Sequence, residues 1–212
     1  MAIEMRYKPR QLSEYLLQLN KWCIELQNSQ NGVEMKFLKL GETWRDKVYF
    51  VAGEDLLKVS GEVKVLYTAL ATAIDGAVEF SNKINSTEGY EGSEIHPIEI
   101  PEFSSKILGE DLRQMYGEEI ENVINLDDME AFSRELIRYT DETEKMLAAI
   151  KRKHRDIGDD KVWVSPQYDQ LAEVIDDLNR QMAVSIDNLR FSQVIVEKKH
   201  SELLAALHSN IK

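Results

Sequence analysis

Hydrophobic positions recur at helical spacing along the first forty residues. From residue 11 onward they fall three or four apart, as in an amphipathic helix: Tyr15, Leu16, Leu19, Trp22, Cys23 and Leu26. The polar stretch 27–32 interrupts the pattern, which resumes at Val33 and reaches Leu40. We therefore predict one helix that is weakened in its middle. Gly41 follows it, at a position where a helix commonly ends in the left-handed conformation.

A longer periodic segment covers about residues 45–86. Two rows of apolar residues repeat every seven positions within it, namely Leu56, Val63, Leu70, Ala77 and Ile84, and Val59, Leu66, Ala73 and Phe80. Such rows form the seam of an antiparallel helical pair or coiled coil. A helix of this length would extend about 60 Å, which favours an elongated hairpin.

The segment after this helix breaks the helical pattern. Residues 86–107 contain Pro97 and Pro101, and the residue before a proline avoids the helical region. We therefore predict a linker at 89–109. Within the linker, the stretch 94–103 carries the hydrophobic residues Ile95, Ile98, Ile100 and Phe103. Two interpretations stay open: an extended strap across a bundle, or a disordered tether or peptide that a partner docks.

Three more helical segments follow the linker. A short amphipathic helix is expected at 110–124, and a longer one at about 127–157. Asp127 is the predicted N-cap of the longer helix, because Glu130 stands three residues on, as in a capping box. The last helix covers about 165–208 and begins with a proline, which suits the first turn of a helix.

A short motif occurs at two of the helix breaks. The first copy reads LGETWRDKVY and the second IGDDKVWVSPQY. Each has an apolar residue and a glycine, then a tryptophan (Trp44 or Trp163), then a tyrosine five residues later (Tyr49 or Tyr168). Because internal repeats indicate repeated structural units, we extended the alignment into the flanking helices.

The alignment continues on both sides of the motif. After the motif, seven apolar positions match apolar positions: Leu56, Val59, Val63, Tyr67, Leu70, Ala77 and Ile84 with Ile175, Leu178, Met182, Ile186, Leu189, Val196 and Leu203. Before it, with a two-residue insertion in the second turn, Leu19, Trp22, Val33 and Leu40 match Leu136, Tyr139, Ile150 and Ile157. The chain therefore reads as two helical hairpins, one in 1–88 and one in 110–212. Because one hairpin cannot bury its own apolar faces, we expect an all-α protein whose hairpins pack as an elongated four-helix bundle.

This arrangement resembles the Trp-x-Gly hairpin family, the early-secreted-antigen-like proteins of type VII secretion. The resemblance covers about residues 11–88 and 127–209, although neither turn carries the family's glycine two residues after the tryptophan. It implies helical hairpins that pair into bundles and an export signal of the form Tyr-x3-acidic beyond the second helix. Tyr90 and Glu94 fit that signal.

The four motif aromatics are the candidate site. We expect Trp44 and Trp163 to lie partly exposed at the hairpin tips, with Tyr49 and Tyr168 bracing them. A large aromatic at each bend can cover the end of the apolar seam, while its indole N–H bonds a free carbonyl or water. A structural role is favoured, and partner binding at the tips stays open.

The formal net charge is −12, which disfavours nucleic acid and anionic membranes as partners and favours a protein with a basic surface. The densest basic run, 151–155, is interpreted as the positive end of a helix. The single cysteine, Cys23, allows no disulfide within the chain, which suits a reducing compartment. No signal peptide or membrane span is expected, so we predict a cytoplasmic protein, with export without a signal peptide left open.

Candidate catalytic chemistry is sparse. The four histidines include no pair at i,i+4, and Glu197 with His200 fits a solvated helix face better than a metal site. Phosphate-loop and nucleophile-elbow motifs are also missing from the sequence. We predict no enzyme activity, no cofactor and no metal.

We predict a non-enzymatic protein–protein interaction module, a Trp-x-Gly-like partner or adaptor in a bacterial secretion or conflict system. Its alternative is an intracellular scaffold, or an immunity or regulatory protein that blocks a partner through its acidic surface. Either a monomeric bundle or a swapped homodimer is compatible with the pattern.

Overall fold

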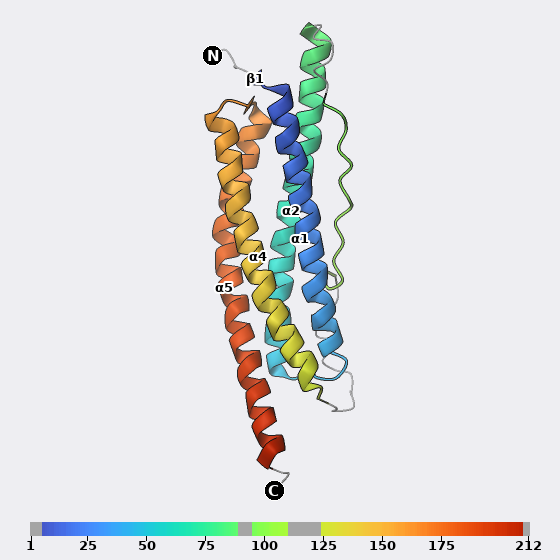
Figure 1. Ribbon diagram of the computed structural model, residues 1–212, viewed down its shortest axis with the longest axis vertical. Coiled ribbons are helices and arrows are strands. Elements are labelled where there is room, and N and C mark those ends of the chain that lie inside the picture. The colour runs from blue at the N-terminus through green and yellow to red at the C-terminus, as the bar shows by residue number, and fades with distance from the viewer. Residues whose placement is uncertain (1–5, 89–94, 110–123, 210–212) are drawn as a thin grey trace. The chain divides into compact units, whose positions relative to one another are not determined.

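The computed structural model describes residues 6–88, 95–109 and 124–209. Within these ranges the chain is all-α, as predicted, and its four helices are labelled in Figure 1. Their bounds are α1 Pro9–Leu40, α2 Lys47–Glu88, α4 Leu126–Asp159 and α5 Pro166–Ser209. Two strands of two residues each, β1 Arg6–Tyr7 and β2 Trp163–Val164, pair in antiparallel fashion. The sequence analysis did not predict this pairing.

The first helix is continuous through the polar stretch, as predicted. Gln30 is fully buried and Ser29 nearly so, so these side chains serve as interior polar groups. Gly32 permits a close approach to α4, because a Cβ there would lie 2.9 Å from the Oε1 atom of Glu135.

The starts of α2, α4 and α5 lie within two residues of the predicted ones, but the capping residue of α4 differs from the prediction. Asp46 caps α2 by accepting the N–H groups of Val48 at 2.7 Å and Tyr49 at 3.2 Å. The N-cap of α4 is Asn125, whose Oδ1 accepts the N–H groups of Asp127 at 3.1 Å and Asp128 at 3.3 Å. The prediction of Asp127 as the cap is therefore wrong. Asparagine is an equally good cap, and it precedes the aspartates in the chain.

The chain forms two compact units, each built from segments far apart in sequence. Unit 1 comprises Met1–Gln27, Val63–Phe103 and Lys145–Arg180, and unit 2 comprises Asn28–Glu62, Ser104–Glu144 and Gln181–Lys212. Each unit therefore draws on all four helices. The expected divisions at 1–88, 89–109 and 110–212 follow chain order and remain a prediction.

The alignment of the two halves is reflected in burial. The first six of the seven matched pairs after the motif are buried on both sides, and Ile84 and Leu203 are both half-buried. The four matched pairs before the motif are also buried on both sides. Matched residues thus occupy matched interior positions, as their shared helical periodicity predicts.

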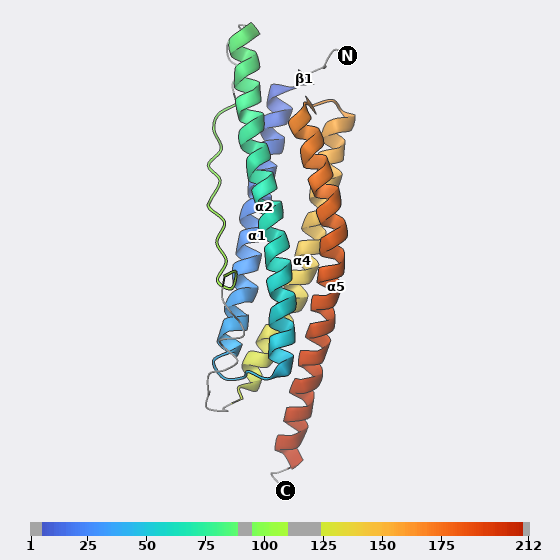
Figure 2. The same ribbon diagram turned by 180° about the vertical axis from the view of Figure 1, so that it is seen from behind.

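The linker segment 95–103 lies extended along α1 and α2 in unit 1 (Figure 1, Figure 2). Asn20 donates to the carbonyl of Glu99 at 3.2 Å, and the Tyr67 hydroxyl donates to the carbonyl of Pro101. Ile95 is buried, and the ring of Phe103 lies 5.2 Å from that of Tyr67. Of the two interpretations, the strap is the correct one for these residues.

Two sequence predictions lie outside the described residues. They are the possible export motif at Tyr90 and Glu94 and the short helix at 110–124, of which only Ile124 is described. Among the described helices, none is long and apolar enough to cross a membrane.

Candidate functional site: two repeated aromatic turns

The first turn, in unit 2, is a closed aromatic stack. Trp44 and Tyr49 are both buried. The Tyr49 ring lies parallel to that of Phe37 with centroids 4.3 Å apart, and Trp44 meets Tyr49 edge-on at 6.2 Å. The Tyr49 hydroxyl donates to the Phe37 carbonyl at 3.3 Å. Each ring is therefore held by another ring of the same turn.

Gly41 is required in this turn because Tyr49 lies against it. A Cβ at Gly41 would lie 2.8 Å from the Cζ atom of Tyr49, inside van der Waals contact. The predicted left-handed conformation at Gly41 is wrong, since Gly109 is the glycine with positive φ among the described residues. The glycine provides space for a side chain, and a special backbone angle is not needed.

The second turn, in unit 1, repeats this geometry. Trp163 is fully buried and Tyr168 half-buried. Tyr168 stacks on His154 with centroids 4.2 Å apart, and Trp163 meets Tyr168 edge-on at 5.8 Å. The Tyr168 hydroxyl donates to the His154 carbonyl at 3.0 Å. A Cβ at Gly158 would lie 2.7 Å from the Cζ atom of Tyr168.

Phe37 and His154 complete the repeated motif. Each stands four residues before its glycine and supplies both the stacking ring and the carbonyl acceptor. Sequence comparison found the glycine, tryptophan and tyrosine but missed this fourth position, because phenylalanine and histidine do not match as apolar residues. A search for any planar ring one helical turn before the glycine would have found it.

The expected partial exposure of the two tryptophans is wrong. Trp44 is 4% exposed and Trp163 0%. At the second turn, Trp163 belongs to β2, where its backbone pairs with that of Tyr7. The Trp163 indole nitrogen is buried with no hydrogen-bond partner among the described residues. Neither indole is therefore available to a partner.

His154 is a buried, neutral histidine. Its Nδ1 lies 2.6 Å from the Tyr15 hydroxyl and its Nε2 3.2 Å from the Tyr168 carbonyl. Burial lowers the pKa of His154 to about 4. The neutral ring donates its Nε2–H to the carbonyl and accepts the Tyr15 proton at Nδ1, so both nitrogens are satisfied.

The interpretation of 151–155 as a positive helix end needs correction. Helix α4 extends to Asp159, and its last turn holds no basic residue. Lys151 instead pairs with Asp176 at 2.8 Å, and His154 is part of the core. Within this run, His154 is therefore a core residue, whereas Lys151 lies on the helix surface.

A second buried polar group lies in unit 2 around Glu34. Its carboxylate accepts bonds from Gln30 Nε2 and Ser105 Oγ, both at 2.6 Å, and from the Lys106 N–H at 2.5 Å. The Tyr139 hydroxyl donates to Gln30 Oε1. Buried carboxylates require such partners, and these bonds fix residues 105–106 to α1. The carboxylate oxygens are thus committed to internal bonds.

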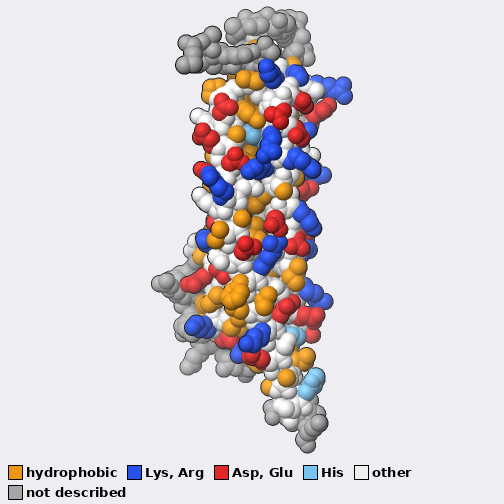
Figure 3. Space-filling model, turned by 90° about the vertical axis from the view of Figure 1, so that its left-hand side faces the viewer, with side chains coloured by type: hydrophobic (Ala, Val, Ile, Leu, Met, Phe, Trp, Pro, Cys, Tyr) orange, Lys and Arg blue, Asp and Glu red, His pale blue; other side chains and the backbone are white. Residues whose placement is uncertain are grey.

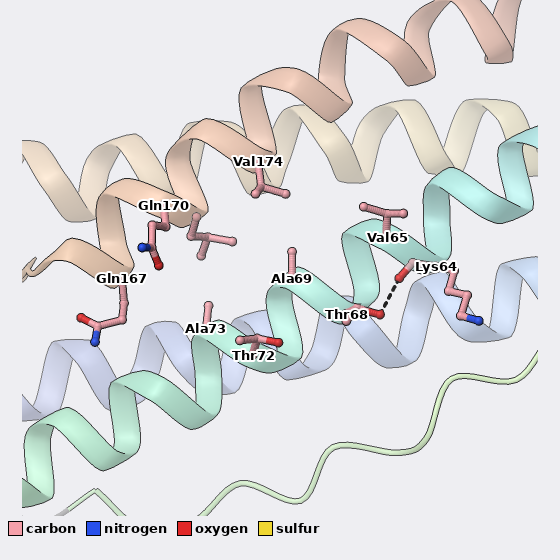
Figure 4. Close-up of a pocket in the computed structure, with 10 residues that line it drawn as sticks. Lys64, Val65, Thr68, Ala69, Thr72, Ala73, Gln167, Gln170 and Val174 are labelled. Carbon is pink, nitrogen blue, oxygen red and sulfur yellow. Dashed lines mark hydrogen bonds between the residues drawn. The ribbon is translucent and has the colours of Figure 1, made fainter.

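Unit 1 contains an apolar groove of about 460 Å³ between α2 and α5 (Figure 4). Its lining is Lys64, Val65, Thr68, Ala69, Thr72, Ala73, Gln167, Gln170, Leu171 and Val174. The Thr68 hydroxyl is bonded to the Lys64 carbonyl at 2.9 Å. The four motif aromatics are not among these residues.

Two other residues discussed in the sequence analysis are Cys23 and Glu197. Cys23 is fully buried, and burial raises the pKa of its thiol to about 12. Glu197 accepts a bond from Ser133 at 3.2 Å. In the described part of the chain, no group of three or more His, Cys, Asp or Glu could hold a metal ion.

Helix α5 carries an exposed apolar surface in unit 2. Val184, Phe191 and Val194 are each more than half exposed, and their spacing places them on one helical face. Figure 3 shows hydrophobic side chains gathered in one place on the side where α5 lies in Figure 1, bordered by charged groups. We call these three residues the α5 patch.

Ile137 of α4 adjoins the α5 patch. Arg190 contacts Asp141 of α4 at 3.0 Å. Val194 lies one turn after Arg190, and Ile137 lies one turn before Asp141. Because neighbours on a helix face are four residues apart, Ile137 and Val194 lie side by side. Ile137 is also exposed.

Comparisons with protein-family models, with curated proteins and with solved structures find no match. Functional inference for this chain therefore starts from its own geometry. That geometry brings Trp44 together with Tyr49, and Trp163 together with Tyr168, in two buried turns. It leaves the α5 patch as a large apolar surface in contact with water.

Proposed function

We propose that this chain is a non-enzymatic protein–protein interaction module, a Trp-x-Gly-like partner or adaptor in a bacterial secretion or conflict system. The α5 patch is the observation that carries the proposal. Its three apolar side chains are exposed to water on the outer face of a helix. Clustered exposed apolar side chains are typical of protein-binding surfaces, and an aromatic such as Phe191 is a common anchor.

The repeated turns have a structural role in this proposal. Their tryptophans are buried, so a partner could not reach them without unfolding the turn. Their function is to join long helices while covering the apolar interior with aromatic rings. Partner binding is thereby assigned to α5, away from the residues that the sequence motif highlights.

The state of the buried titratable groups supports a non-enzymatic role. Both nitrogens of His154 are occupied by internal partners. The Cys23 thiol, whose pKa is about 12, is protonated at neutral pH, and the thiolate is the reactive form. The Glu34 carboxylate is bonded to three internal donors. None of these groups is arranged to act on a bound substrate.

Site-directed photo-cross-linking in the producing cell tests the proposal. A photoreactive amino acid is placed at position 194 and, as a control, at position 17. Val194 and Leu17 are both 55% exposed, so they differ in location and not in accessibility. We expect protein adducts from position 194 and few from position 17. Equal adduct yields at the two positions, or none, would contradict the proposal.

Cell fractionation separates the secretion role from the intracellular alternative. Detection of the protein in the culture medium, lost in Tyr90→Ala or Glu94→Ala, would support the secretion role. A second readout is the intracellular amount of each variant, which should be unchanged. Retention of the wild-type protein inside the cell would overturn the secretion role and favour a scaffold or immunity role.

A further inference from the structure

The outward face of α5 has a repeating pattern beyond the α5 patch. Positions seven apart are Val184, Phe191 and Lys198, and the positions three residues after each are Asp187, Val194 and Ser201. This is the spacing of the two contact positions in a coiled coil. All six residues belong to unit 2. Three of these six positions are apolar and three are polar or charged, and all six lie on the side of α5 opposite the buried core.

Charges stand at both ends of the apolar centre of this face. Asp187 precedes Phe191 by one turn, and Lys198 follows Val194 by one turn. The Asp187 side chain is 77% exposed, although it lies 3.7 Å from Arg190 of its own helix, and Lys198 is exposed. The apolar centre, Phe191 and Val194, is thus flanked by a negative charge on its N-terminal side and a positive charge on its C-terminal side.

From this arrangement we propose that the α5 patch binds the α5 patch of a second copy of this chain, with the two helices antiparallel. In antiparallel helices, the first contact position of one helix faces the second contact position of the other. Phe191 then packs on Val194 of the second copy, and Asp187 faces Lys198 of the second copy. The two-fold symmetry generates each of these contacts twice.

The charge pattern selects this orientation. A parallel pair would place Asp187 opposite Asp187 and Lys198 opposite Lys198, and like charges across an interface are unfavourable. The antiparallel pair places an opposite charge at each of these positions. The net charge of −12 makes two copies repel at long range. Dimer formation therefore requires both the local pairs of Asp187 with Lys198 and the screening of the remaining charge by salt.

The extent of the face sets the expected affinity. Residues 184–201 span about 26 Å of helix at about 1.5 Å per residue. A single helix pair of this length is a small interface, and small interfaces are typical of transient complexes. We therefore expect a reversible dimer that is in exchange with monomer.

Sedimentation velocity of the full-length protein at physiological salt tests the proposal. The concentration series extends from about 1 μM to about 1 mM, so that a weak dimer is detected. We expect a monomer–dimer equilibrium. Phe191→Asp should raise the dissociation constant at least tenfold, whereas the control Leu17→Asp, on an exposed residue of unit 1, should leave it unchanged.

Charge reversal then tests the orientation. Asp187→Lys alone and Lys198→Glu alone should each weaken the dimer, because each places like charges opposite one another. The double variant should restore wild-type affinity. Failure of this restoration, or a dimer that is insensitive to Phe191→Asp, would overturn the antiparallel pairing.

This inference rests on the proposed role of the α5 patch, and its failure can be distinguished from failure of that role. A protein that stays monomeric throughout the series, yet gives heterologous adducts from position 194 in cells, overturns the second copy as occupant and leaves the interaction module intact. A monomer with no adducts overturns both.

Discussion

The two aromatic turns differ at one ring. Phe37 stacks on Tyr49 in the first turn, and His154 stacks on Tyr168 in the second, with centroid separations of 4.3 and 4.2 Å. The phenylalanine ring has only apolar contacts to offer, whereas the histidine ring also bonds Tyr15 and the Tyr168 carbonyl. The same packing geometry is therefore compatible with an apolar ring and with a polar ring whose hydrogen bonds are satisfied.

The comparison shows which parts of the motif are interchangeable. Glycine, tryptophan and tyrosine are the same in both turns because each meets a steric requirement, such as the contact of the tyrosine ring with the glycine. The stacking ring varies because only its planar shape is required. Histidine at this position ties α1 to the second turn through Tyr15 and makes that turn sensitive to pH.

The largest expected effect comes from removing either tryptophan. Trp44→Ala and Trp163→Ala should each lower the free energy of unfolding by about 3–5 kcal/mol, as for other buried aromatics. Chemical denaturation at neutral pH measures both. Phe191→Ala is the control and should change stability by less than about 0.5 kcal/mol, because the side chain is exposed. If Trp44→Ala removed partner binding at unchanged stability, the first turn would be a binding site.

Substitution of the glycines tests the steric explanation in both turns. Gly41→Ala and Gly158→Ala should each cost about 1–3 kcal/mol, because the added methyl group overlaps the tyrosine ring. The matched control is Gly61→Ala in α2, where a Cβ would meet nothing within 4 Å. That variant should be stabilised by up to about 1 kcal/mol, as expected for alanine in a helix. A stabilising effect at Gly41 would contradict the contact.

Removing the Tyr15 hydroxyl should affect the second turn alone. Tyr15→Phe leaves the buried Nδ1 of His154 without a donor and should cost about 1–2 kcal/mol. In His154→Phe, which has no nitrogen to satisfy, the further change Tyr15→Phe should cost less. A double-mutant cycle by chemical denaturation measures the coupling energy. Full additivity would show that the Tyr15–His154 bond does not contribute.

Regular features of the fold could be predicted from the sequence. The helices, the uninterrupted α1 and the burial of matched positions follow from periodicity, because a repeated apolar spacing has one structural solution. The features that were missed have no periodic signal. A strand pair of two residues each, Arg6–Tyr7 with Trp163–Val164, is too short to show alternation, and the choice of Asn125 over Asp127 as cap depends on where α4 begins.

The candidate site was predicted in part. Glycine, tryptophan and tyrosine recur at both turns, so a sequence repeat identifies them. Their burial could not be inferred, since turns are usually exposed and the strand at Tyr7 that pairs with Trp163 was not expected. The α5 patch was also missed, because Phe191 and Val194 interrupt a polar face without forming a recognised motif.

The most direct test of the account is the pH dependence of stability at the second turn. The folded pKa of His154 is about 4, below its usual value of 6.5, so the unfolded chain binds a proton that the folded chain does not bind between these pH values. Stability contributed by the neutral ring is complete above about pH 6.5 and is lost as the pH falls toward 4.

The measurement is the free energy of unfolding at pH 7 and pH 5.5, in the wild-type protein and in the double variant His154→Phe with Tyr15→Phe. Comparing the two proteins removes the contribution of groups other than His154. We expect the wild-type protein to lose about 1 kcal/mol more than the double variant over this interval. Equal losses in the two proteins would contradict a buried, neutral histidine as the ring that distinguishes the second turn from the first.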